Sequence, residues 1–328
     1  MTIFSLLWAP EVPEYAERAR VVRSAGDRAA EPVGIGSQDV VIVSGAVSLR
    51  GRYEHLRTAR RLQRQHPGLG VVVSDATWYP RSALGESRAG CLQWVLSSVE
   101  QRLLMSLDRG RTRYCFLTEE ERISFSAASG VPLADIAVTP FFPTVQLEET
   151  FDALLADAGE SRGYVFSGGN AVRDYALLRE ALGGTDIPVR IATRNPAPKP
   201  PPNFTEGPVP HAEFFRLMAS ALAVVVPMDA SSRRSAGQQS YLNAMRLGKP
   251  TVVNDALGVR ALTAGGAFVV PARDPSALRD RVRWIMDSGN REALQEVVAC
   301  GVHLTSHELT QRRYYLQLLE IAEQLQAG

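Results

Sequence analysis

The chain has 328 residues and a net charge of +1, from 36 basic and 35 acidic side chains. This length suffices for two domains with separate cores, and the balanced charge argues against a nucleic-acid partner. The three cysteines lie far apart in the sequence, which is typical of reduced thiols, so we expect a cytoplasmic protein. No apolar run reaches the about 20 residues that cross a bilayer, so we expect no transmembrane segment.

The first half of the sequence alternates between strand and helix patterns. Residues 1–38 give no clear pattern: 3–8 fit a strand or a helix end, and 11–23 are weakly helical. We expect strands at residues 39–44, 70–74, 114–118 and 136–139, and helices at 52–65, 89–107 and 119–129. Strands that alternate with helices indicate a parallel, doubly wound sheet.

The second half repeats this alternation after an acidic, loop-like connection at residues 140–162. We expect strands at residues 163–167, 188–193, 223–226, 251–253 and 267–270, and helices at 172–182, 212–221 and 239–247. Asp274 can cap a further helix that begins at Pro275, and two more helices complete the chain. Residues 195–210 hold seven prolines and are predicted to form an extended surface loop rather than a strand.

The stretch from Ala219 to Asn254 reads as strand, polar loop, helix and strand, and the chain is organised around it. Ser235 is an acceptable N-cap for the helix, and Gly237 permits a ligand to approach the backbone closely. Gly248 ends the helix before the next strand begins. A helix start at the carboxyl end of a parallel strand is a good site for a phosphate.

This stretch resembles the donor-binding helix of GT-B-fold glycosyltransferases of the retaining, family-4-like kind. The match is specific at Ala244-Met245 and at Gly248-Lys249-Pro250. Many such enzymes carry two glutamates eight residues apart, whereas this chain has Ser235 and Asn243 at those positions. A branch of the superfamily instead has a Gly-Gln pair at the helix start, and Gly237-Gln238 is similar to that pair.

The resemblance implies an α/β protein with two Rossmann-like, doubly wound parallel-sheet domains that face a cleft. We expect an acceptor-binding domain at residues 1–145, a linker at 146–162 and a nucleotide-sugar-binding domain at 163–305. A C-terminal helix at 306–328 is expected to pack back across the cleft. The implied activity is transfer of a sugar, with retention, from a nucleotide-diphosphate sugar to a small-molecule or glycan acceptor.

Two loops are predicted to bind the donor. Gly168 and Gly169 follow a strand and precede a helix, and Arg173 lies where resembling enzymes carry a basic residue near the donor phosphates. The alternative for the glycine pair is a tight turn. In the second loop, Gln239 can bind phosphate or sugar hydroxyls or can face solvent, and Asn243 can reach a ribose hydroxyl. The predicted donor residues are Gly168, Gly169, Arg173, Arg194, Ser235, Gly237, Gln238, Gln239, Ser240 and Asn243.

The acceptor side is predicted in the first domain. Asp75 directly follows a strand, so it is a candidate base for the acceptor hydroxyl, with a turn-capping role as the alternative. Ser44 ends the neighbouring strand, and Trp78 and Tyr79 are candidate walls of the acceptor pocket.

We expect neither a cofactor nor a metal site. The chain has no D-x-D motif, and His303 and His307, although at helical spacing, lack a third ligand. The donor base, UDP or GDP, stays open, as does the oligomeric state. The arginine-rich helix at 52–64 is expected to face solvent, with contact to an anionic membrane surface as the alternative. A catalytically inactive sugar-nucleotide-binding relative, or a sugar-nucleotide epimerase of the same fold, is the alternative function.

Overall fold

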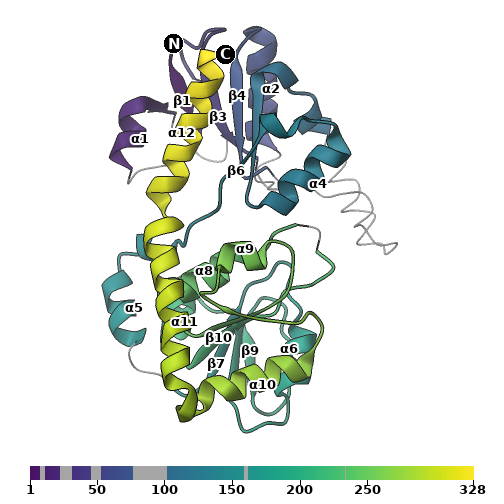
Figure 1. The fold of residues 1–328 in the computed structure, drawn as a ribbon, viewed down its shortest axis with the longest axis vertical. Coiled ribbons are helices and arrows are strands. Elements are labelled where there is room, and N and C mark those ends of the chain that lie inside the picture. The colour runs from purple at the N-terminus through teal and green to yellow at the C-terminus, as the bar shows by residue number, and fades with distance from the viewer. Residues whose placement is uncertain (8–11, 23–31, 46–52, 77–101, 159–161, 233) are drawn as a thin grey trace. The chain divides into compact units, whose positions relative to one another are not determined.

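The computed structural model describes residues 1–7, 12–22, 32–45, 53–76, 102–158, 162–232 and 234–328 (Figure 1). Contacts within the chain divide it into two compact units. Unit 1 comprises Met1–Phe141 together with Gln311–Gly328, and unit 2 comprises Phe142–Thr310.

Unit 1 is built around a six-stranded sheet in which every pairing is parallel and the strand order is β2-β1-β3-β4-β5-β6. Its strands are β1 (Ile3–Ser5), β2 (Ala19–Val21), β3 (Val40–Ser44), β4 (Gly70–Ser74), β5 (Thr112–Phe116) and β6 (Ile136–Val138). Its described helices are α1 (Pro13–Arg18), α2 (Glu54–Gln65), α4 (Glu119–Ser129) and α12 (Gln311–Ala327), with 3-10 turns at Arg109–Arg111 and Leu133–Asp135.

Local chemistry sets several of these boundaries. The side chain of Thr118 accepts a hydrogen bond from the Glu121 amide at the start of α4, and Gly130 ends that helix with a φ of 70°. The C-terminal helix α12 packs against β3 and β4, as its yellow ribbon shows in Figure 1. An edge-to-face pair between Tyr15 and Tyr315, with ring centroids 5.0 Å apart, fixes α12 to α1.

Unit 2 holds a second six-stranded parallel sheet, with the strand order β12-β11-β10-β7-β8-β9. Its strands are β7 (Val165–Gly168), β8 (Val189–Ala192), β9 (Phe204–Gly207), β10 (Ala223–Val226), β11 (Thr251–Asn254) and β12 (Phe268–Val270). Its described helices are α5 (Phe151–Ala158), α6 (Tyr175–Leu182), α7 (His211–Ala219), α8 (Gln238–Arg246), α9 (Val259–Thr263), α10 (Pro275–Met286) and α11 (Arg291–His303), with 3-10 turns at Val145–Leu147 and Ser288–Asn290 and a π-turn at Leu304–Glu308.

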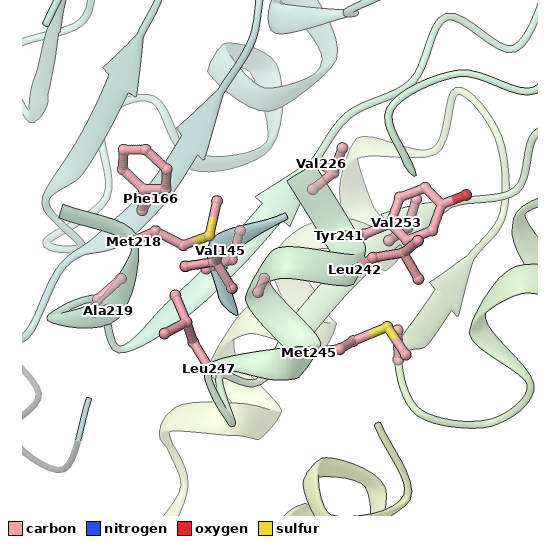
Figure 2. Close-up of a cluster of buried hydrophobic side chains, with 14 of the residues drawn as sticks. Val145, Phe166, Met218, Ala219, Val226, Tyr241, Leu242, Met245, Leu247 and Val253 are labelled. Atoms are coloured by element: carbon pink, nitrogen blue, oxygen red, sulfur yellow. The ribbon is translucent and has the colours of Figure 1, made fainter. Parts of the chain in front are cut away.

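The two faces of this second sheet are covered by separate hydrophobic clusters. Figure 2 shows one of them, in which Phe166 and Val226 from the strands lie near Met218 of α7 and Leu242 of α8. All four side chains are fully buried. Helix α8 is therefore fixed to the sheet by its apolar face, and its N-terminus lies at the carboxyl end of the strands.

Two sequence predictions about strands were wrong. Residues 204–207 form strand β9, because four residues without proline, between the prolines at 202 and 208, suffice for pairing with β8 on one side only. Residues 19–21, which were expected to be helical, form strand β2 and pair with β1. The helix predicted at 89–107 lies mostly outside the described residues.

Candidate functional site

The order of the strands marks one edge of the sheet in unit 2. Strand β7 lies between β8 and β10, so the connection after β7 leads to one side and the connection after β10 leads to the other. In open parallel sheets, ligands bind at this switch point, beyond the carboxyl ends of the strands. Both loops that the sequence predicts as donor-binding, after Gly168 and after Met228, begin there.

The first loop turns a guanidinium back onto its own backbone. Arg173 Nε donates to the carbonyl of Gly168 at 3.1 Å, and Nη1 donates to the carbonyl of Ala171 at 2.9 Å. Arg173 Nη2 donates to Oγ of Ser240, in the first turn of α8, at 2.8 Å. Arg173 therefore joins the two predicted loops in space.

Arg173 has no carboxylate partner among the residues that the structure describes. Burial lowers the pKa of its guanidinium, which nevertheless stays charged at neutral pH because arginine titrates so high. A buried cation needs compensation from an opposite charge or from hydrogen bonds. Here carbonyl and hydroxyl oxygens hold the guanidinium, and an anionic ligand would supply the missing charge.

Two of the predicted glycines make room for this guanidinium. A Cβ atom on Gly169, where φ is 119°, would lie 2.7 Å from Arg173 Nη2. A Cβ atom on Gly237, where φ is 78°, would lie 3.0 Å from Arg173 Nη1 and 2.5 Å from Met228 Sδ. Gly168 has a different reason, since its Cβ would overlap the ring of Phe214. The sequence predicted that a ligand approaches the backbone at Gly237 and at the Gly168-Gly169 pair, with a tight turn as the alternative for the pair. In the structure, a neighbouring side chain already restricts each of the three positions.

The start of helix α8 lies beside this cation. Gly237 is its N-cap, and the amides of Ser240 and Tyr241 donate to the Gly237 carbonyl at 2.8 and 3.3 Å. Gln238 is 9% exposed, and its Nε2 has no hydrogen-bond partner among the described residues. The N-terminus of a helix carries partial positive charge and favours anions. Arg173, the helix start and the free Gln238 amide are together suited to bind a diphosphate.

The side chains of Gln239 and Asn243 are engaged elsewhere. Asn243 Oδ1 accepts the amides of Thr144 and Val145 at 2.7 and 2.9 Å, and Gln239 Oε1 accepts from the Thr144 hydroxyl at 2.7 Å. The sequence predicted that Asn243 contacts a ribose hydroxyl and that Gln239 contacts the donor or faces solvent. In the structure, both side chains form hydrogen bonds with the segment that contains Thr144. Ser235, the third polar residue predicted there, is 2% exposed.

A cavity of about 200 Å³ opens next to the first loop. Its floor and walls come from the ends of β7, β8 and β9 and from the start of α7. The lining residues are Gly169, Asn170, Ala192, Thr193, Arg194, Pro208, Val209, His211 and Phe214. The lining combines apolar side chains, among them Val209 and Phe214, with polar ones that could fix the orientation of a small molecule.

Asn170 organises the mouth of this cavity. Its Oδ1 accepts the backbone amide of Arg194 at 2.7 Å and the hydroxyl of Thr193 at 3.3 Å. The Arg194 side chain is exposed and has no partner among the described residues, so it is free to contact a ligand at the cavity. His211 also lines the cavity and lies 3.0 Å from Glu148, Nε2 to Oε1. Neither residue was among the predicted donor residues, although the sequence places Asn170 in the loop after the glycine pair and His211 in a loop near the nucleotide. Their contacts depend on how these loops meet.

In unit 1, the predicted acceptor residues lie at strand ends. Asp75 follows β4 with a φ of 46°, in the left-handed region that few residues other than glycine, asparagine and aspartate adopt. The amide of Ser44, at the end of β3, donates to Nδ1 of His55 at 3.1 Å. Burial lowers the pKa of His55, with Glu54 opposing the shift. Trp78 and Tyr79 lie outside the described residues.

Tyr314 reaches the same strand end from α12. Its hydroxyl is hydrogen-bonded to the Ser74 side chain, whose own hydroxyl donates to the carbonyl of Val43 at 3.1 Å. Burial first, and then the negative charge of Asp75, raise the pKa of Tyr314 well above its usual value, so the phenol stays neutral. No pattern in the sequence connects Tyr314 with Asp75, which lies far earlier in the chain.

Within the described ranges, no group of three or more histidine, cysteine, aspartate or glutamate side chains is placed to hold a metal ion. No helix in the described part of the chain is long and apolar enough to span a membrane.

The comparisons with known proteins rest on structure. The sequence matches no protein-family profile, and no curated protein matches it. Sucrose-phosphate synthase from Thermosynechococcus elongatus superposes with a TM-score of 0.65 at 12% identity, over 88% of this chain and 74% of that chain. A glycosyltransferase from Rickettsia africae gives 0.61 at 10% identity, over 98% and 89%. WaaG, a glycosyltransferase involved in lipopolysaccharide biosynthesis, gives 0.60 at 14% identity and is covered, like this chain, over 100% of its length.

The chain has the GT-B fold. The two parallel sheets, one in each unit, correspond to the two α/β domains of that fold. At these identities the likeness is one of architecture, so the chemistry must be argued from the site.

Proposed function

We propose that this protein transfers a sugar from a nucleotide-diphosphate sugar to an acceptor, with retention of configuration. The observation that carries the proposal is Arg173, a half-buried cation without a described carboxylate partner, held against Gly237 at the start of α8. Structures with this fold include proteins named as glycosyltransferases and sugar-phosphate synthases, which supports a sugar-transfer reaction.

The proposed chemistry follows from charge. When the bond between the sugar and the diphosphate breaks, negative charge builds up on the leaving phosphate. Arg173 and the first amides of α8 would stabilise that charge, with Gln238 as a further donor. These groups supply positive charge without a metal ion, and we propose a metal-independent reaction on that basis.

The cavity beside Asn170 is proposed to hold the nucleoside of the donor, with Arg194 and His211 at its edge. Asp75 is proposed to orient or deprotonate the acceptor hydroxyl, because it is an acid at the carboxyl end of a strand in unit 1. We keep the cytoplasm as the proposed location.

A thermal-shift screen with UDP, GDP, ADP and dTDP tests the donor site. A ligand that binds only the folded state, at 100 times its dissociation constant, stabilises that state by about 2.7 kcal/mol. We expect one diphosphate to raise the melting temperature of the wild-type protein and to have little effect on Arg173→Ala. If no nucleotide stabilises the wild type, the donor site is wrong.

Turnover separates a transferase from an inactive sugar-nucleotide-binding relative. We expect slow hydrolysis of the donor sugar in the absence of an acceptor, and we expect the rate to survive EDTA. Tight binding without any turnover would favour the inactive relative. A rate that is lost in EDTA and restored by magnesium or manganese would contradict the metal-independent reaction.

A further inference from the structure

The second turn of α8 grips the segment through which the chain enters unit 2. Asn243 Oδ1 accepts two backbone amides of that segment, those of Thr144 at 2.7 Å and Val145 at 2.9 Å. Asn243 Nδ2 donates to the Thr144 hydroxyl at 3.3 Å and to Gln239 Oε1 at 3.4 Å. Both ends of this side-chain amide are therefore engaged.

Gln239, one helical turn earlier, holds the same segment. Its Oε1 accepts from the Thr144 hydroxyl at 2.7 Å, and its Nε2 donates to the carbonyl of Phe142 at 3.2 Å. The Thr144 hydroxyl thus donates to Gln239 and accepts from Asn243, so the three side chains form a closed polar network. We call Thr144, Gln239 and Asn243 the clamp.

The clamp is partly buried: Asn243 is buried, and Thr144 and Gln239 are half-buried. Val145, whose amide it binds, is 0% exposed and belongs to the hydrophobic cluster under α8 (Figure 2). Asn243 is 3% exposed. Hydrogen bonds of buried groups resist exchange with water, and removing one partner leaves the other unsatisfied. The clamp is therefore a rigid connection.

Through Gln239, the clamp is directly adjacent to the proposed donor site in the sequence of α8. Ser240 follows Gln239 in the first turn of α8, and its Oγ accepts from Arg173 Nη2. The amide of Ser240 donates to Gly237, the residue at the helix start. If the hydrogen bonds of Gln239 were lost, the first turn of α8 could rotate. Such a rotation would move the guanidinium of Arg173 and the amides at the helix start.

We propose that Asn243 and Gln239 are positioning residues, which hold the first turn of α8 on the segment 142–145 so that the helix start and Arg173 keep the geometry for a diphosphate. The identity of the ligand in this inference rests on the proposed function, whereas the clamp rests on the hydrogen bonds in the structure. It gives Asn243 a role distinct from the direct donor contact that the sequence interpretation assigned to it.

The test compares Asn243→Ala with Asn243→Asp and Gln146→Ala. Aspartate keeps the oxygens that accept the Thr144 and Val145 amides. Gln146 is the matched control, because its Oε1 accepts from Arg246 Nε at 3.3 Å, on the same helix but farther from its start. Hydrogen exchange is measured for the amides of Ser240 and Tyr241 in the free protein, and the affinities for UDP, GDP, ADP and dTDP are measured by calorimetry.

For Asn243→Ala we expect exchange at Ser240 and Tyr241 to rise about tenfold and nucleotide affinity to fall about tenfold, the loss of one good hydrogen bond. Asn243→Asp keeps the acceptors for the Thr144 and Val145 amides but loses the Nδ2 donor, so it should recover only part of both losses, and Gln146→Ala should change neither by more than about twofold.

The outcomes separate the two proposals. If Asn243→Ala lowers the melting temperature but leaves exchange at the helix start and nucleotide affinity as in the wild type, the clamp is only structural and the inference is wrong. If the wild type binds none of UDP, GDP, ADP and dTDP, the proposed donor site is wrong, and the exchange measurement alone decides the clamp: faster exchange at Ser240 and Tyr241 supports it, and unchanged exchange overturns it.

Discussion

The carboxyl ends of the two sheets hold their polar groups in different ways. In unit 2 the central group is a cation, and Arg173 is fixed by backbone carbonyls and by space that Gly169 and Gly237 leave open. In unit 1 the central group is the carboxylate of Asp75, whose backbone has a left-handed conformation. The neutral phenol of Tyr314 lies near it. One region is arranged around positive charge and the other around a carboxylate.

This difference suggests a division of labour within the proposed reaction. A fixed cation and helix amides suit the stabilisation of a leaving phosphate, whose charge changes while its position does not. A carboxylate at the carboxyl end of a strand suits the transfer of a proton from an acceptor hydroxyl. Variants that act on one region and not on the other can break or sharpen this comparison.

The largest effect is expected from Gly237→Ala. The added Cβ meets Met228 Sδ and Arg173 Nη1, and φ is positive, so we expect a loss of about 2–4 kcal/mol in the free energy of unfolding. Gly184→Ala is the control, since its φ of 73° is similar and no atom lies within 4 Å of its Cβ. It should cost about 1–2 kcal/mol. Equal losses in urea unfolding would show that the space beside Arg173 is not tight.

Arg173→Ala should act on binding more than on folding. The guanidinium forms charged hydrogen bonds with an anionic ligand, and losing such a bond costs about 1.5–3 kcal/mol. We therefore expect the affinity for the best nucleoside diphosphate to fall about tenfold to 150-fold. Arg194→Ala, at the exposed edge of the cavity, should lose less. The reverse order in calorimetric titrations would move the phosphate toward the cavity.

Asp75→Asn should lower transfer to the acceptor while nucleotide affinity stays nearly unchanged. Asparagine tolerates a left-handed backbone, so the fold should be retained. General acid–base catalysis typically raises a reaction rate by about 100-fold or more. Because the departing phosphate can itself serve as a proton acceptor, we expect the transfer rate to fall by about tenfold to 100-fold. The measurement is initial transfer rate and nucleotide affinity on one preparation. Equal loss of both would place Asp75 on the donor side, and an unchanged rate would reduce it to a turn residue.

The sequence predicted the local elements better than the partners of the site. Strands β4 and β10 have the predicted bounds, because each is an uninterrupted β-branched run closed by a polar residue or a proline. Residues Phe204–Gly207 were missed because an edge strand needs little sequence signal of its own.

The site shows the same limit. Arg173 and Gly237 could be selected from their loops, and the structure brings them together. Asn243 could not be assigned its partners, because Thr144 lies 99 residues earlier in a segment that the sequence reads as a connection. Tyr314 could not be connected with Asp75 for the same reason. Motifs identify a group and its local backbone, whereas hydrogen bonds between distant segments depend on the packed fold.

The smallest effect concerns His55 and the pH dependence of unit 1. Because the Ser44 amide donates to Nδ1, the ring is neutral and carries its proton on Nε2. Burial lowers the pKa of His55 in the folded protein below its usual value. As the pH falls through the usual value for histidine, the unfolded chain binds a proton that the folded chain does not, so the free energy of unfolding decreases.

His55→Gln removes the titration and leaves an oxygen that can accept the Ser44 amide. We expect wild-type stability to fall more steeply than that of the variant as the pH is lowered from 7.5 to 5.5, and the difference in slope cannot exceed about 1.4 kcal/mol per pH unit for one proton. Urea unfolding at four pH values measures it. Parallel profiles would show that His55 titrates alike in both states, and the neutral ring beside Ser44 would then be wrong.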